Sequence, residues 1–384
     1  MGASVRIAIA GFGIGGATSA LALARSGHEV TVFERGTLPG PVGAGFLLQP
    51  SGQAVLADLG LLEAVAAAGW PIRAFHAESA PGRTLSLLRY DRRDPSAYAL
   101  GVARRRLVAT LSTAAIATGV RIVPGTRVTG ARETTREVVP IDEAGRDLGT
   151  YDVLVGADGM RSALRRLVDP GSRLFLSPFA ALWGLGRTGA TCPDRLRQQA
   201  RGIGTLTGLL PVGEREMAVF WGLRACDLDA LRAEGFAALV ERAAAAFPDT
   251  REILMDIASF NRLALARYGY ANVARRHTGR IVLIGDAGHP SPPHLGQGAN
   301  LAMLDAAALA VSFTRHREPA RAFRHWEQRR RWQNGRYTLL ARALSPFFQS
   351  SHGWLGPTRD IALPLMGATP PLRAVMERVL AGRG

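Results

Sequence analysis

The feature that most limits how this chain can fold is a glycine pattern close to its N-terminus. Residues 5–10 are almost wholly apolar and run directly into Gly11-Phe12-Gly13-Ile14-Gly15-Gly16. An Ala- and Leu-rich stretch typical of a helix follows, and then a second predicted strand, residues 29–33, ends at Glu34. This order of strand, glycine turn, helix, strand and acidic residue is typical of a dinucleotide-binding βαβ unit. It predicts an α/β chain with a Rossmann-like domain.

The residues of this pattern have separate physical tasks. Gly11 allows the tight turn and Gly13 lets the backbone approach a pyrophosphate, whereas Gly16 lets the helix pack close to the strand, and Gly15 completes the glycine-rich turn. Glu34 would accept hydrogen bonds from the hydroxyls of an adenosine ribose. Because the pattern serves NAD and FAD alike, it leaves the choice of dinucleotide open.

A second strand of the same kind ends in a carboxylate. Residues 152–157 are mainly apolar and lead into Asp158-Gly159, which Met160-Arg161-Ser162 follows. Asp-Gly is a strong turn pair, so an ordinary turn is one interpretation. The other is a contact with pyrophosphate and ribose hydroxyls, for which Asp, Arg and Ser are suited.

The third such segment is residues 280–300. Its short apolar strand stops at Gly285-Asp286, and a loop rich in proline and glycine then leads to a helical pattern from about Gly298. The free N–H groups at the start of that helix, which include those of Ala299 and Asn300, favour an anionic part of a ligand. This segment therefore predicts a seat for a nucleotide or flavin.

Two further positions are candidates for cofactor contact. Gly45 belongs to a glycine-rich connection into a helix that we expect to be capped by Ser51 and to run to about Ala68, and its backbone could pass close to a flat ring. Arg104 begins another predicted helix and could clamp a phosphate. The alternatives are a plain loop for Gly45 and a solvated surface for Arg104.

The middle of the chain has a different pattern. Residues 72–90 alternate around Pro81-Gly82, which indicates a hairpin of a separate sheet, and residues 179–186, 206–211 and 217–223 also read as strands. If this sheet covers the cofactor, Trp183, Phe220 and Trp221 would line an apolar chamber for a flat substrate. Arg187 could pair with a carboxylate or phenolate of that substrate. Ordinary core packing, and solvation in the case of Arg187, is the competing interpretation.

The segments that contain Glu34, Asp158 and Asp286 are called the first, second and third carboxylate segments. Together they resemble the motifs of the class A flavoprotein monooxygenases, the family of para-hydroxybenzoate and salicylate hydroxylases. The glycine turn with Glu34 resembles the FAD motif of that family, Asp158-Gly159 its DG motif, and Gly285-Asp286 to Asn300 its GD motif. The resemblance covers most of the chain and favours FAD. It implies a glutathione-reductase-type FAD-binding domain with an inserted β-sheet substrate domain and C-terminal helices.

The resemblance also implies roles for individual residues. Arg35 would lie near the adenine, Arg104 at the pyrophosphate and Asp286 at the ribityl or pyrophosphate part of FAD, while Asp158 would serve both FAD and nicotinamide use. Pro293 would lie beside the isoalloxazine ring. His294 stands where the family often has an aromatic residue, and it is a candidate general base for a phenol.

The activity implied by the resemblance is the FAD-dependent hydroxylation of an aromatic, phenolic or heteroaromatic small molecule. It would use O2 and NADH or NADPH and proceed through a flavin C4a-hydroperoxide. We expect the FAD-binding domain in residues 1–71, 99–171 and 281–345, the substrate domain in 72–98 and 172–280, and a helical segment without chemistry in 346–384. The alternatives are an FAD-dependent reductase or epoxidase of an isoprenoid or polyketide-type substrate, and a non-enzymatic flavin-binding module.

Composition bears on the partners. The net charge of +16 would suggest nucleic acid, but all 47 basic residues are Arg and they are scattered along the chain, which favours a coding bias instead. Two cysteines exclude a disulfide framework and a zinc quartet. Lacking a long apolar span or a secretion-type N-terminus, the chain is expected to be a cytoplasmic monomer or homodimer that binds neither membranes nor metals.

Overall fold

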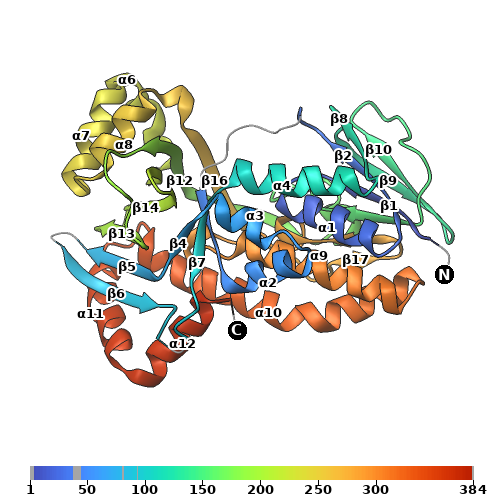
Figure 1. Ribbon diagram of the computed structural model, residues 1–384. Helices are drawn as coiled ribbons and strands as arrows, with labels where there is room; N and C mark the ends of the chain where they lie inside the picture. Colours follow the sequence, from blue (N-terminus) through green and yellow to red (C-terminus); the bar gives the residue numbers. More distant parts are fainter. Residues whose placement is uncertain (1–3, 38–44, 80–81, 93, 383–384) are drawn as a thin grey trace.

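The glycine turn opens a largely parallel sheet of six strands. The computed structural model describes residues 4–37, 45–79, 82–92 and 94–382 (Figure 1). The strands of this sheet, in spatial order, are β17 (His277–Thr278), β18 (Ile281–Leu283), β11 (Val153–Gly156), β1 (Arg6–Ala10), β2 (Glu29–Glu34) and β8 (Arg121–Pro124). β1 lies at the centre, between β11 and β2, so the strands that carry the glycine turn and Asp158 are neighbours.

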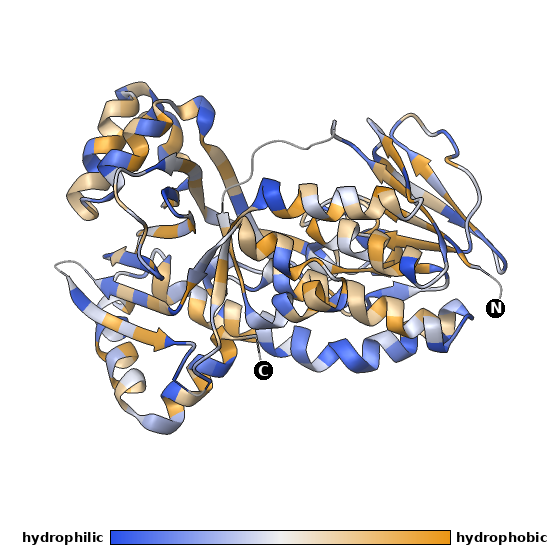
Figure 2. Ribbon diagram, in the orientation of Figure 1, coloured by the Kyte–Doolittle hydropathy of each residue, from blue (hydrophilic) through white to orange (hydrophobic). Residues whose placement is uncertain are grey.

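Helices pack against this sheet and against one another. They are α1 (Ile14–Arg25), α2 (Pro50–Asp58), α3 (Leu62–Ala67), α4 (Arg104–Ala117), α5 (Arg165–Val168), α9 (Gly298–Arg315) and α10 (Pro319–Phe348). α1 packs on both α4 and α9, and Phe313, Phe323 and Trp326 close the core where α9 meets α10. Figure 2 shows the strands as mainly hydrophobic and α10 as hydrophilic over much of its length.

A second sheet has seven strands. In spatial order they are β16 (Ala264–Asn272), β12 (Arg173–Arg187), β15 (Glu216–Arg224), β14 (Thr205–Gly213), β13 (Arg195–Arg201), β5 (Ala74–Ser79) and β6 (Arg83–Arg89). The helices α6 (Leu228–Glu234), α7 (Phe236–Ala246) and α8 (Thr250–Ile257) pack on one of its faces. The predicted hairpin of residues 72–90 is present as β5 and β6, although Pro81 lies outside the described residues.

Smaller elements join these parts. A three-stranded sheet contains β3 (Gly45–Leu48), β7 (Ala99–Ala103) and β4 (Trp70–Ile72), and β9 (Val128–Glu133) pairs with β10 (Val138–Asp142). The C-terminal helices α11 (Leu355–Ala368) and α12 (Pro370–Leu380) pack on β6 (Figure 1). Within the described residues, no helix is long and apolar enough to cross a membrane.

One predicted helix was wrong in its start and in its continuity. The expected helix from Ser51 to Ala68 is two helices, α2 and α3, separated at Gly60, which has a positive φ of 58°. Gln49 occupies the N-cap position, and Pro50 begins α2 because the fixed φ of proline suits a first helical turn.

Candidate functional site

The glycine turn has the close packing that its sequence predicts. Gly11 has a φ of +95°, and a Cβ on it would lie 2.6 Å from the carbonyl oxygen of Ala157. A Cβ on Gly16 would overlap the carbonyl oxygen of Gly11. Both glycines are therefore needed for the fold of the turn itself, because an added methyl group has no room at either position.

Gly13 and Gly15 have different surroundings. A Cβ on Gly13 would have one described atom within 4 Å, the Nη2 of Arg104 at 3.9 Å, so the backbone there is accessible and the guanidinium of Arg104 lies over it. A Cβ on Gly15 would lie 3.2 Å from the Cβ of Ala302 in α9. Gly15 therefore serves helix packing, whereas Gly13 leaves space for a ligand.

The Glu34 carboxylate lies at the edge of the same turn. Its Oε2 accepts a hydrogen bond of 2.7 Å from the Phe12 N–H, and its Oε1 accepts one of 2.8 Å from the Gly36 N–H. These bonds fix the orientation of the carboxylate beside the turn, and its remaining lone pairs are free to accept ribose hydroxyls. Arg35, the next residue, is exposed.

Asp158 lies directly against the glycine turn. A Cβ on Gly11 would be 3.1 Å from the Cα of Asp158. One carboxylate oxygen accepts a 2.8 Å hydrogen bond from the Ala163 N–H, and the other is buried without a partner among the described residues. Burial raises the pKa of this carboxyl, against the hydrogen bonds that lower it. A buried oxygen of this kind calls for a donor such as a hydroxyl group.

Asp286 lies beside the start of α9. A Cβ on Gly298 would be 3.7 Å from Asp286 Oδ1. The side chain is exposed but has many protein atoms around it, and this partial desolvation raises its pKa, while His289, Arg104 and Arg165 oppose the shift. Arg104, at the start of α4, is thus close enough for its positive charge to act on the Asp286 carboxylate.

Asn300 and Gly45 have structural partners. The buried Asn300 side chain accepts from the Gln49 N–H at 2.9 Å and donates to the carbonyl oxygens of Leu47 (3.1 Å) and Gly296 (3.2 Å), so it fastens α9 to the end of β3. The neighbouring Ala299 packs against the main core. A Cβ on Gly45 would collide with Val212, which explains a glycine there without a cofactor.

Arg165 joins the second and third carboxylate segments, and the sequence did not single it out. It is 4% exposed, and its guanidinium donates to the carbonyl oxygens of Met160 (2.7 Å), Asp286 (2.9 Å) and Ala287 (2.8 Å). Because it bonds backbone oxygens on both segments, it fixes their separation. Ser162, expected as a ligand contact, accepts from the Arg165 N–H at 3.0 Å.

A second buried group that the sequence did not reveal lies behind Gly285. The Asp305 carboxylate accepts from the Gly285 N–H (3.0 Å), bonds His289 Nε2 (2.5 Å) and pairs with Arg330 Nε (2.7 Å). Burial disfavours its charge, but His289 and Arg330 hold its pKa well below the usual range. Asp305 is therefore a buried anion that fixes the GD segment through its hydrogen bond with the Gly285 N–H.

The aromatic residues of the large antiparallel sheet divide between its two faces. Trp183 and Phe220 stack with ring centroids 4.9 Å apart on the face away from α6–α8. Trp221 follows Phe220 on the same strand, so it points to the opposite face and packs in the helix-covered core. Arg187 is exposed at the end of β12, where its N–H bonds Asp256 at 2.9 Å. The structure brings Trp183 and Phe220 together and separates Trp221 and Arg187 from them.

The loop after the GD segment meets this aromatic face through the end of α10. Pro293 is exposed at the start of the turn η4 (Pro293–Leu295). His294 Nε2 lies 3.2 Å from Gln349 Oε1, and that amide oxygen also accepts from the Tyr268 hydroxyl of β16. Desolvation lowers the pKa of His294 to about 4. The segment after Pro346, expected to have no chemistry, thus supplies a neighbour of His294.

The residues around the glycine turn and the GD segment fit a dinucleotide. Besides Asp158 Oδ1, the Gln49 amide nitrogen is buried without a partner among the described residues, and Gln49 lies against Asn300 near the start of α9. The accessible backbone at Gly13 and the cation of Arg104 suit a pyrophosphate. Unpaired hydrogen-bonding groups near such a seat are the expected partners of ribose and ribityl hydroxyls.

Comparisons with known proteins agree with this assignment. A family profile described as an FAD binding domain matches residues 4–322. The 6-methylpretetramide 4-monooxygenase of Streptomyces rimosus is 30% identical, over 99% of this chain and 93% of that protein.

Two solved structures are similar over nearly their whole length. The Klebsiella pneumoniae protein HpxO, in complex with FAD and uric acid, has a TM-score of 0.82 at 26% identity, covering 98% of this chain and 97% of that chain. The Pseudomonas aeruginosa protein PqsL, in complex with 2-aminobenzoylacetate, has a TM-score of 0.80 at 26% identity, covering 92% of this chain and 99% of that chain.

Proposed function

The chain belongs to the FAD-dependent aromatic monooxygenases, and we propose that it oxygenates a flat phenolic or heteroaromatic small molecule with NADH or NADPH as the electron donor. The observation that carries the proposal is the aromatic face of Trp183 and Phe220, which meets the loop of the GD segment through Tyr268, Gln349 and His294. A flat ring held on that face would lie beside the cofactor seat.

Bound FAD would supply the redox chemistry: it accepts electrons from NAD(P)H and passes them to O2. No side chain of the protein provides this chemistry. We assign the pyrophosphate to Arg104 and the open backbone at Gly13, the adenosine ribose to Glu34, and a ribityl or phosphate oxygen to Asp286. Asp158 offers its unpaired oxygen to the cofactor from the neighbouring strand end.

The residues around the ring portion have other tasks. Pro293 would limit the approach of water along one side of the flavin, and the N–H groups at the start of α9 would stabilise negative charge on the reduced ring. Exclusion of water protects a reactive oxygenating species from wasteful decay. Arg35, Gly45 and Ala299 are further proposed contacts of the cofactor.

The substrate is proposed to be a neutral aromatic compound with an oxygen acceptor on its ring. Trp183 Nε1 is a buried donor without a partner among the described residues, and one end of the Gln349 amide is also unpaired. A carbonyl or hydroxyl oxygen of a substrate would satisfy them. The nearby titratable groups, His294 and Tyr268, are neutral at pH 7 because desolvation lowers the pKa of the first and raises that of the second.

On this assignment the seven-stranded sheet would be the substrate domain and the six-stranded sheet the FAD-binding domain. The names of similar proteins refer to 6-methylpretetramide, uric acid and 2-aminobenzoylacetate, which fits a ring-containing substrate with several acceptors. A reductase or epoxidase would use the same FAD seat but would not require the ring-stacking face.

The proposal is tested with purified holoenzyme. Oxygen-dependent oxidation of NADH and NADPH is followed while a panel of hydroxylated and keto-substituted aromatics is added, and products are identified by mass spectrometry. We expect at least one aromatic compound to accelerate the oxidation and to gain one oxygen atom from O2. Bound flavin with no aromatic acceleration, together with reduction of a polyene or epoxidation of an isoprenoid, would contradict it.

A further inference from the structure

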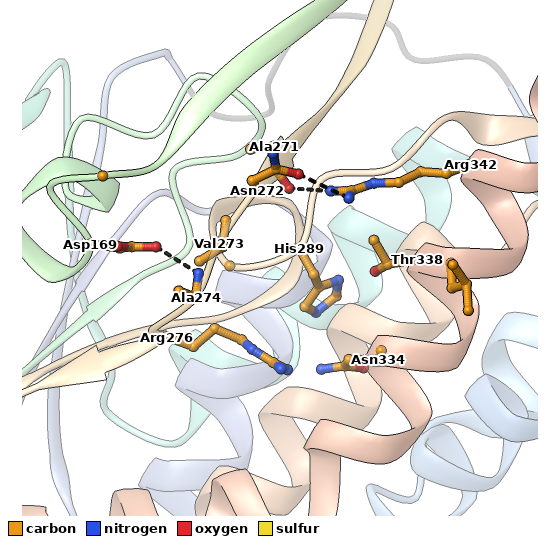
Figure 3. A pocket seen from close by; sticks show the side chains of 14 residues that line it. Asp169, Ala271, Asn272, Val273, Ala274, Arg276, His289, Asn334, Thr338 and Arg342 are labelled. Atoms are coloured by element: carbon orange, nitrogen blue, oxygen red, sulfur yellow. Dashed lines mark hydrogen bonds between the residues drawn. The ribbon is translucent and has the colours of Figure 1, made fainter.

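A cavity of about 480 Å³ lies where the chain crosses between the two large sheets. Asp169 and Gly171 lie on the connection from α5 to β12, and residues 271–276 lie on the connection from β16 to β17. Residues of α10 between Asn334 and Arg342 also line the cavity, and so does His289 (Figure 3). None of the residues assigned to FAD lines this cavity, so it is a separate site.

Two arginines give the cavity a positive character. Neither Arg276 nor Arg342 has an ion-pair partner within the part of the chain that the structure describes, and a guanidinium nitrogen of each is buried without a hydrogen-bond acceptor. Figure 3 shows the Arg276 side chain extending toward Asn334 below His289. The one carboxylate that lines the cavity, Asp169, already accepts a 2.6 Å hydrogen bond from the Ala274 N–H.

The Arg342 guanidinium is held in place by neutral groups. Its Nη1 donates to Asn272 Oδ1 at 3.0 Å and its Nη2 to the Ala271 carbonyl oxygen at 2.5 Å, and it lies 4.6 Å from the ring centroid of Tyr270. These contacts orient the cation without neutralising it. An unpaired guanidinium N–H that lies away from water calls for an acceptor, preferably a charged one.

The rest of the lining suits an organic ligand. Val273 and Leu339 present apolar side chains beside the two cations. The volume lies in the range of small-molecule sites, which are common where two structural units meet. We propose that this cavity binds a small organic anion, with its carboxylate or phosphate oxygens on Arg276 and Arg342 and its apolar part against Val273 and Leu339.

This site is connected to the GD segment. His289 and Asn334 line the cavity, and both bond the Asp305 carboxylate, at 2.5 Å and 2.9 Å. Asp305 in turn accepts the Gly285 N–H. An anion in the cavity would lie beside the hydrogen-bonded group that holds Gly285-Asp286. On the FAD seat proposed above, we expect its binding to shift the visible absorption spectrum of bound FAD.

The first experiment compares charged and neutral probes on the holoenzyme. Titration calorimetry and flavin absorbance are recorded with butyrate, inorganic phosphate and butyramide at constant ionic strength. We expect saturable binding of butyrate or phosphate and none of butyramide, which has nearly the shape of butyrate without its charge. Stronger binding of butyrate identifies an organic acid as the ligand class, and stronger binding of phosphate identifies a phosphorylated compound.

The second experiment locates the site. Arg276→Gln and Arg342→Gln each remove one cation and should weaken anion binding about tenfold or more. Arg275→Gln, at the exposed neighbouring position that does not line the cavity, should leave it unchanged. Unaltered binding in both cavity variants, equal binding of butyramide, or no saturable binding of either anion to the wild type overturns the proposal. If one variant does not fold, the other and the butyramide comparison still decide the question.

Discussion

The Nδ1 atom of His294 lies 2.9 Å from the Oγ atom of Ser345. The same Ser345 Oγ atom lies 2.5 Å from the Ala341 carbonyl oxygen, so it joins His294 to the backbone of α10. Tyr268 and Phe348 pack around the same imidazole, each with a centroid distance of 5.9 Å. His294 is therefore a neutral, positioned ring between the GD loop and α10, and its low pKa makes it a weak general base at neutral pH.

Stability should depend on pH through this histidine. The pKa of His294 is about 4 in the folded protein and 6.5 in its ordinary state, so between these values the unfolded chain binds a proton that the folded chain does not. The free energy of unfolding should fall as the pH falls from 6.5 to 4, on the order of 2–3 kcal/mol for this group.

Urea unfolding of the wild type and of His294→Asn across this pH range checks this expectation. The variant lacks the titrating ring, so the difference between the two proteins should shrink toward acid pH. Parallel pH profiles for the two proteins would show that His294 is not desolvated in solution.

The Trp183 indole N–H is expected to bind the substrate. Trp183→Phe keeps a ring that stacks on Phe220 but removes the donor, so KM for a substrate with an oxygen acceptor should rise about tenfold while FAD content stays the same. Trp221→Phe is the matched control, since Trp221 lies on the opposite face of the sheet. Steady-state kinetics with the substrate found in the aromatic panel measures both effects, and equal KM changes in the two variants would argue against the assigned face.

Arg165 should stabilise the fold at the cofactor seat. Arg165→Met leaves the carbonyl oxygens of Met160, Asp286 and Ala287 without this donor, which should lower the free energy of unfolding by about 2–4 kcal/mol and weaken FAD binding. The exposed Arg166 offers the control, because Arg166→Met should change stability by less than about 0.5 kcal/mol. Similar stabilities of the two variants in urea unfolding would mean that Arg165 does not hold the segments together.

Local patterns in the sequence were sufficient to predict the α/β class, the glycine turn and the strands that end at Asp158 and Asp286. Each depends on a short run of residues with a fixed order. The alternation along residues 217–223 also contained the information that Trp221 and Phe220 point to opposite faces, and grouping both in one chamber disregarded that period of two.

Contacts between distant parts of the chain were beyond reach of such patterns. Asp305 meets Arg330 from the next helix, and Gln349 meets Tyr268 across 81 residues. The residues next to an Asp or Gln on a helix do not indicate its partner, because the packing of α9, α10 and β16 determines which side chains meet. The same applies to Arg165, one of 47 basic residues that are all arginine.

The glycines of the first turn provide a test that separates folding from cofactor binding. At Gly16 an added methyl group would overlap the Gly11 carbonyl oxygen, so Gly16→Ala should destabilise the protein by about 2 kcal/mol or more. At Gly13 the nearest described atom, Arg104 Nη2, is 3.9 Å away, so Gly13→Ala should leave the fold intact.

Gly13→Ala should nevertheless lose FAD, because its methyl group occupies the space that we assign to the pyrophosphate. Flavin absorbance after purification and urea unfolding of the apoproteins measure the two properties separately. Gly13→Ala should be a stable protein with little flavin, and its apoprotein should unfold at the same urea concentration as the wild-type apoprotein. Full flavin content in that variant would place the pyrophosphate away from Gly13, whereas loss of stability would mean that the turn has less free space than its geometry indicates.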